Sequence, residues 1–86
     1  MAEPETFWHD GPWITSSEGF KVRSLGRSGM EYVSGSLTLN LASESLATQG
    51  FVLYPRDMPE KVPERVLADV TRAWRWAGFD VETIRP

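Results

Sequence analysis

Leu37-Thr38-Leu39-Asn40-Leu41 is the stretch that decides the fold of this chain. Its leucines alternate with polar residues, which is the period of a β-strand with one buried face and one wet face. A tight turn at Ser34-Gly35 joins it to an earlier strand at residues 30–33. Residues 20–23 alternate in the same way, and a turn with two glycines separates them from the next strand. These patterns predict consecutive antiparallel strands.

The second half of the chain adds a helix and two more strands. Residues 51–54 are apolar at every position, as in a strand that is covered on both faces. Residues 63–77 begin with a proline suited to a first helical turn, carry one apolar stripe and stop at Gly78. Residues 79–83 alternate again and predict a closing strand, which would run parallel to residues 51–54 if the two are neighbours. Residues 42–50 are ambiguous between a short strand and a loop.

The predicted fold class is α+β: a mostly antiparallel β-meander with one long C-terminal α-helix packed on one face and a short closing strand. We expect residues 18–86 to form this single α+β domain and residues 1–17 to form an irregular, aromatic-containing lead-in. The lead-in is too apolar for a free tail, since it holds Phe7, Trp8, Trp13 and Ile14. Either it covers an open face or edge of the sheet, or it forms part of a partner-binding surface.

Composition restricts the function classes. The 86 residues are 24% charged and 41% hydrophobic, with a net charge of −3, as in one small globular domain. The acidic charge argues against nucleic-acid binding, although Lys21, Arg23 and Arg27 share one hairpin. The chain has no cysteine, which excludes disulfides and thiolate metal sites and fits a reducing cytoplasm. The acidic start and the lack of a long apolar stretch predict no signal peptide, no membrane contact and a cytoplasmic location.

No set of residues predicts an enzyme. The single histidine, His9, adjoins an aspartate, but neighbours in an irregular segment rarely point at one site, so a solvated surface histidine is the simpler interpretation. No serine lies in a Gly-x-Ser-x-Gly turn, and the glycines around Ser28 are those of a hairpin. Asp57, Glu60 and Glu64 lie around the helix start, where acids favour the dipole. We therefore predict no metal site and no cofactor.

The helix carries the best binding feature. Trp76 lies about 120° from the centre of the apolar stripe, on the flank that also holds Arg72. The lead-in either shields this tryptophan or leaves it half exposed beside arginine, and both residue types are enriched in interface hot spots. We expect Trp76, Arg72, Trp8 and Trp13 to contact a protein partner.

Six segments together resemble a known family. They are residues 27–32 (RSGMEY), 37–39 (LTL), 44–47 (ESLA), 50–54 (GFVLY), 63–70 (PERVLADV) and 72–81 (RAWRWAGFDV). With these segments, over about residues 19–84, the chain resembles the small α+β immunity proteins of bacterial polymorphic toxin systems. The resemblance implies a non-enzymatic protein that binds a cognate protein toxin and neutralises it by occlusion. The alternative is a self-associating structural or regulatory module, for which a homodimer would cover the open sheet face.

Overall fold

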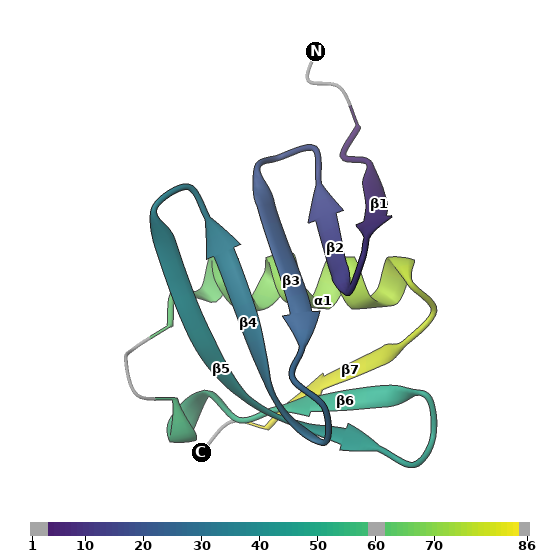
Figure 1. The fold of residues 1–86 in the computed structure, drawn as a ribbon. Coiled ribbons are helices and arrows are strands. Elements are labelled where there is room, and N and C mark those ends of the chain that lie inside the picture. The colour runs from purple at the N-terminus through teal and green to yellow at the C-terminus, as the bar shows by residue number, and fades with distance from the viewer. Residues whose placement is uncertain (1–3, 59–61, 85–86) are drawn as a thin grey trace.

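The described residues, 4–58 and 62–84, form a seven-stranded sheet and one α-helix in a computed structural model (Figure 1). The strands are β1 Phe7–Asp10, β2 Trp13–Ser16, β3 Phe20–Ser24, β4 Ser28–Ser34, β5 Leu37–Leu46, β6 Gly50–Leu53 and β7 Asp80–Thr83. A 3-10 helix, η1, spans Pro55–Asp57, and the α-helix, α1, spans Glu64–Trp76. The α+β class is confirmed. The helix is slightly shorter than expected, with 13 residues, because Pro63 is its N-cap and Ala77 its C-cap.

The strands follow one another across the sheet in chain order, with β1 at one edge and β7 at the other. Neighbours from β1 to β6 are antiparallel. β6 and β7 are parallel, with Gly50 opposite Asp80 and Leu53 opposite Thr83, because the chain crosses over between them through η1 and α1. The sequence predicted a parallel pair on the condition that these two strands are neighbours, and the structure shows that they are.

β5 connects two parts of the sheet. Leu37 to Leu41 pair with β4 and Ser43 to Leu46 pair with β6, and Glu44 has a partner in both strands. The register of β4 shifts at Ser28/Met30, and such irregularities bend a sheet. β6 and β7 consequently run across the ends of the other strands (Figure 1). The ambiguous stretch at residues 42–50 is therefore the end of β5, a turn and the first residue of β6.

α1 covers one face of the sheet and closes the core (Figure 1). Its buried residues, Val66, Leu67, Val70, Ala73 and Trp74, belong to the predicted apolar stripe. The buried sheet residues in the same core include Ile14, Phe20, Val22, Met30, Tyr32, Leu41, Phe51 and Leu53. Trp74 joins the two layers, because its ring centroid lies 4.5 Å from that of Phe51 and its Nε1–H donates to the sulfur of Met30 at 3.2 Å. The opposite face of the sheet is not covered by α1.

The lead-in was expected to be irregular over residues 1–17, but in its described part, residues 4–17, it forms two strands. β1 and β2 form a hairpin whose register runs from Phe7 opposite Ser16 to Asp10 opposite Trp13. The chain reverses at Gly11-Pro12, where Gly11 takes a positive φ of 60° that favours glycine. Sequence patterning missed these strands because the buried position Ser16 is polar and because Trp8, His9 and Asp10 are all exposed, so neither strand shows a clear alternation of apolar and polar residues.

None of the helices in the described ranges is long and apolar enough to cross a bilayer.

Candidate protein-binding site

The face of the sheet opposite α1 carries Trp13. Ile14 and Ser16 point into the core, so the alternation of β2 places Trp13 on the outer face. Lys21 Nζ lies 4.4 Å from the centroid of the Trp13 ring, and Arg23 Cζ lies 5.0 Å from it. Contacts of this kind are favourable cation–π interactions. They fix the ring as part of an amphipathic surface.

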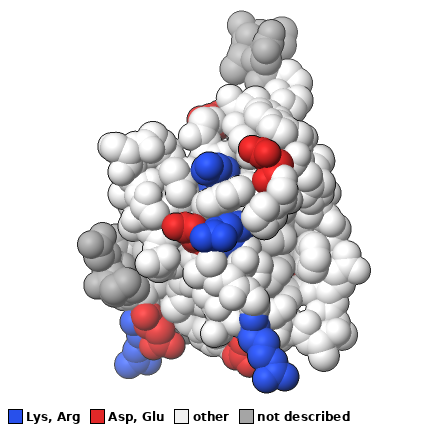
Figure 2. All heavy atoms as spheres, viewed as in Figure 1, with Lys and Arg blue, Asp and Glu red and all other residues white. Residues whose placement is uncertain are grey.

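The same face carries only a small group of charges in its centre. Arg23 NH2 lies 2.7 Å from Glu31 Oε1, so this arginine is paired on the neighbouring strand. Figure 2 shows the central charged groups surrounded by uncharged atoms on this side of the molecule. The surface is therefore mixed, without the continuous basic field that a nucleic-acid backbone attracts.

Trp8 lies on this outer face one strand nearer the sheet edge, diagonal to Trp13, whose opposed residue on β1 is Asp10. Phe7 points toward the core, and alternation turns Trp8 the other way. Its side chain is 46% exposed. The residue opposite it on β2 is Thr15, whose hydroxyl is buried without a hydrogen-bond partner among the described residues. Trp8 is thus a large apolar surface at the rim of an uncovered sheet.

Trp76 lies on the other side of β1. Its ring centroid is 5.8 Å from that of Phe7 and 5.0 Å from that of His9. Even so, Trp76 remains 45% exposed. The sequence left open whether the lead-in shields Trp76 or leaves it half exposed. In the structure the lead-in covers one side of the ring, and the other side is open to solvent. His9 was interpreted as a solvated surface histidine, and it is exposed, with its ring against that of Trp76.

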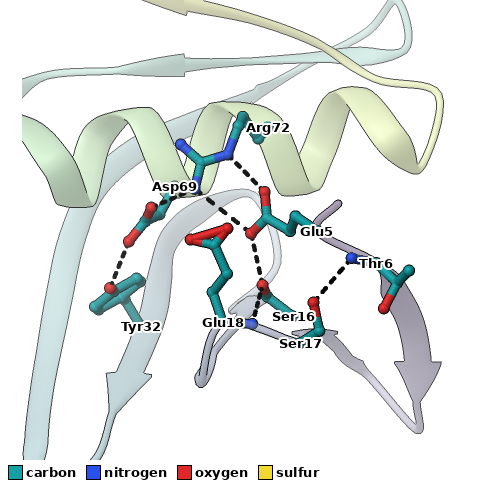
Figure 3. A network of polar contacts seen from close by, with 8 residues as sticks. All are labelled: Glu5, Thr6, Ser16, Ser17, Glu18, Tyr32, Asp69 and Arg72. Atoms are coloured by element: carbon teal, nitrogen blue, oxygen red, sulfur yellow. Dashed lines mark hydrogen bonds and ion pairs between the residues drawn. The ribbon is translucent and has the colours of Figure 1, made fainter. Parts of the chain in front are cut away.

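Arg72 is occupied within the chain (Figure 3). Its Nε donates to Glu5 Oε1 at 2.8 Å, and its NH2 group donates to Asp69 Oδ1 at 2.6 Å. The hydroxyl of Ser16 donates to the other carboxylate oxygen of Glu5 at 2.6 Å. We call Glu5, Ser16, Asp69 and Arg72 the polar clamp, since they join the segment before β1 to β2 and α1.

The polar clamp shifts two pKa values. Burial by itself would raise the pKa of Glu5, but hydrogen bonds from Arg72 and Ser16 outweigh it and hold that pKa below its ordinary value. Hydrogen bonding to Glu5, followed by the contact with Asp69, raises the pKa of the Arg72 guanidinium despite partial burial. Both groups are therefore charged throughout the physiological range, and the primary role of Arg72 is to hold the chain together.

Tyr32 extends the polar clamp into the core. Its hydroxyl donates to Asp69 Oδ2 at 2.9 Å (Figure 3). Burial, together with the hydrogen bond to this carboxylate, raises the pKa of Tyr32 to about 12. A phenol with such a pKa stays protonated near neutral pH, which suits a structural donor.

The four predicted contact residues meet around β1, but on two sides of it. Trp8 and Trp13 share the outer face, whereas Trp76 and Arg72 belong to α1 on the inner side. No group of three His, Asp or Glu side chains able to hold a metal ion occurs in the described ranges, and Glu60 lies outside them. The arrangement offers aromatic surface, hydrogen-bonding edge and fixed charges, which are the means of binding another protein.

Sequence reasoning missed Glu5 and Ser16. Glu5 and Arg72 are 67 positions apart, and the hairpin that brings them together has no strong pattern. Comparisons with protein-family models, curated proteins and solved structures found no match to this chain.

Proposed function

We propose that this chain is a non-enzymatic protein-binding domain of the immunity type, which binds a cognate protein toxin in the cytoplasm and neutralises it by steric occlusion. The resemblance over about residues 19–84 supports the type of partner. The exposed aromatic residues around β1 support the mode of action, since occlusion requires a protein-binding surface rather than a catalytic site.

The observation that carries the proposal is the exposure of Trp8 on the sheet face that α1 leaves uncovered and that Trp13 shares. Exposed tryptophan costs free energy in water, and interfaces recover that cost by burying the ring. Tryptophan is also the residue type most enriched among interface hot spots. Lys21 and Arg23 adjoin the Trp13 ring, so they supply the polar rim of such an interface.

Trp76 and Arg72 take different parts in this proposal. Trp76 offers its solvent side to a partner that reaches around the β1 edge. Arg72 contributes indirectly, because its bonds to Glu5 and Asp69 hold the lead-in in place. Replacing Trp8 with alanine should therefore weaken toxin binding by more than about 1 kcal/mol without unfolding the domain, whereas replacing Arg72 should act through stability.

Affinity capture followed by a growth assay tests the proposal. The tagged chain is used to capture partners from a lysate of its own cells, and a captured protein is then expressed alone and together with this chain. We expect the captured protein to arrest growth alone, the wild-type chain to relieve the arrest, and Trp8→Ala to relieve it less. Leu46→Ala is the control, because Leu46 is also exposed but lies at the far end of β5. A captured protein that leaves growth unaffected contradicts neutralisation.

A self-associating module is the second candidate, and the open edge of β1 favours it. β1 ends the sheet and pairs only with β2 among the described strands. Capture of copies of this chain alone would favour this candidate over the toxin-binding one.

A further inference from the structure

β1 presents hydrogen-bonding groups at the open edge of the sheet in a defined order. The Ser17 N–H donates to the Thr6 carbonyl at 2.9 Å, so Thr6 and Ser17 are a hydrogen-bonded pair. Opposed residues in an antiparallel ladder alternate between pairs that exchange hydrogen bonds and pairs that do not. With the observed register, Trp8 exchanges hydrogen bonds with Thr15. The N–H and C=O groups of Phe7 and His9 therefore face the open edge.

These outward groups are symmetric about Trp8. We propose that two copies of this chain pair antiparallel through β1, with Phe7 opposite His9 of the second copy and Trp8 opposite Trp8 at the two-fold axis. Phe7 and His9 of each copy then exchange four backbone hydrogen bonds with the other copy. The sheet continues from one copy into the next. This inference develops the self-associating candidate, and because it buries Trp8 between two copies, it competes with toxin binding for that residue.

The proposed register makes Trp8 face itself in the closer kind of pair. Pairs that do not exchange hydrogen bonds have Cα atoms about 4.5 Å apart, and aromatic pairs at such positions stabilise sheets. The exposed part of Trp8 would thus be buried against its own symmetry mate on the outer face. On the inner face, Phe7 would meet His9 of the second copy beside Trp76, whose ring already contacts both residues in one copy.

Charge distinguishes β1 from the other open edge. In the proposed register, the charged residue Asp10 falls opposite the neutral Thr6 of the second copy. The corresponding pairing of β7 about Val81 would set Asp80 directly opposite Glu82. Like charges at opposed positions destabilise a ladder, and natural edge strands use charge in this way to prevent pairing. β7 is therefore protected against self-association, and β1 is not.

Analytical ultracentrifugation of two His9 variants tests the pairing. In His9→Pro, the ring removes the outward N–H and obstructs the edge, while the hydrogen bonds between β1 and β2 remain. In His9→Ala, the N–H is kept and only the side chain is lost. We expect the wild type and His9→Ala to shift from monomer to dimer as concentration rises, and His9→Pro to stay monomeric with an unchanged circular dichroism spectrum. A wild type that stays monomeric at every concentration overturns the proposal. It does so even if β1 is found to pair with a strand of a different protein, because the proposed partner is a second copy of this chain.

Cross-linking tests the two-fold axis separately, and does not require a proline variant to fold. The chain has no cysteine, so a single introduced cysteine can form a disulfide only between copies. Trp8→Cys places two Cβ atoms within disulfide range at the axis, and Thr38→Cys is the control at an exposed position of β5. We expect mild oxidation to give a covalent dimer of Trp8→Cys but not of Thr38→Cys. Equal cross-linking of the two variants, or dimerisation of His9→Pro equal to that of His9→Ala, overturns the proposed register.

Discussion

Ser16→Ala should lower the free energy of unfolding by about 2–3 kcal/mol, because Ser16 is the buried centre of the polar clamp. The side chain is 3% exposed, donates to Glu5 Oε2 at 2.6 Å and accepts from the Glu18 N–H at 3.0 Å. A hydrogen bond to a charged group contributes about 1.5–3 kcal/mol and a neutral one about 0.5–1.5 kcal/mol. Glu5 keeps its bond to Arg72 in the variant, which offsets part of the loss. The remainder is a large share of the roughly 4–13 kcal/mol expected for a domain of this size.

The neighbouring serine provides a matched control. Ser17 is exposed, and its hydroxyl accepts one hydrogen bond, from the Thr6 N–H at 2.9 Å. Urea denaturation followed by tryptophan fluorescence should show a loss below about 1 kcal/mol for Ser17→Ala, and hydrogen exchange in β1 should accelerate more in Ser16→Ala. Equal stability of the two variants, or a Ser16→Ala variant as stable as the wild type, would refute the role of the polar clamp.

The pH dependence of stability provides a second test of the hydrogen bond between Ser16 and Glu5. The pKa of Glu5 is lower in the folded chain than in the unfolded chain, so the unfolded chain takes up the proton first as pH falls. The stabilisation by Glu5 is therefore present above the ordinary carboxyl pKa and is lost as pH falls through the lowered value. The stability difference between the wild type and Ser16→Ala should accordingly shrink in acid. A constant difference down to low pH would contradict this linkage.

Three further variants have defined expectations. Tyr32→Phe removes the hydrogen bond to Asp69 and should cost about 1–2 kcal/mol near neutral pH. Because the pKa of Tyr32 is raised to about 12, the wild type should also lose stability from about pH 10 to 12. Phenolate absorbance and denaturation measurements would detect this loss, and Tyr32→Phe should not show it. Thr15→Val removes a buried hydroxyl without a described partner and should raise the free energy of unfolding by about 0.5–1 kcal/mol; a lower melting temperature would count against this assignment. Trp76→Ala should cost about 2 kcal/mol, roughly half the value for a fully buried tryptophan, because the ring is 45% exposed; unchanged thermal stability would show that its contact with β1 contributes nothing to folding.

The central strands were predictable because their side chains alternate strongly. Leu39 and Leu41 point into the core and Asn40 points away, as period two requires. The α1 stripe was predictable for the same reason at the helical period. The long connection between β6 and β7 allowed a parallel pair, but that the two strands are neighbours was a condition that only the structure establishes.

The first hairpin could not be predicted from local pattern. β2 buries a polar residue, Ser16, and what makes this burial tolerable is the hydrogen bond to Glu5. That bond depends in turn on Arg72, which lies far away in the sequence on α1. Hydrogen bonds between residues far apart in the sequence leave no periodic pattern, so the segment was interpreted as a loop.

The candidate site was predictable in composition but not in arrangement. Tryptophans outside the apolar periodicity indicated an interaction surface, and the structure leaves Trp8 and Trp76 nearly half exposed. Which of these tryptophans lies on which face depends on the β1 side chains that point outward, and only the register of the hairpin fixes these. Arg72 was expected to contact a partner; it also bonds two carboxylates within the chain, while 43% of its side chain stays exposed.

The most direct test of the central claim is calorimetric titration of the captured toxin with the wild-type chain and with Trp8→Ala. The account predicts that the variant keeps its fold but binds at least about fivefold more weakly, the loss expected of a hot-spot tryptophan. Equal affinities of the folded variant and the wild type would contradict the claim that the outer face around Trp8 is the binding surface.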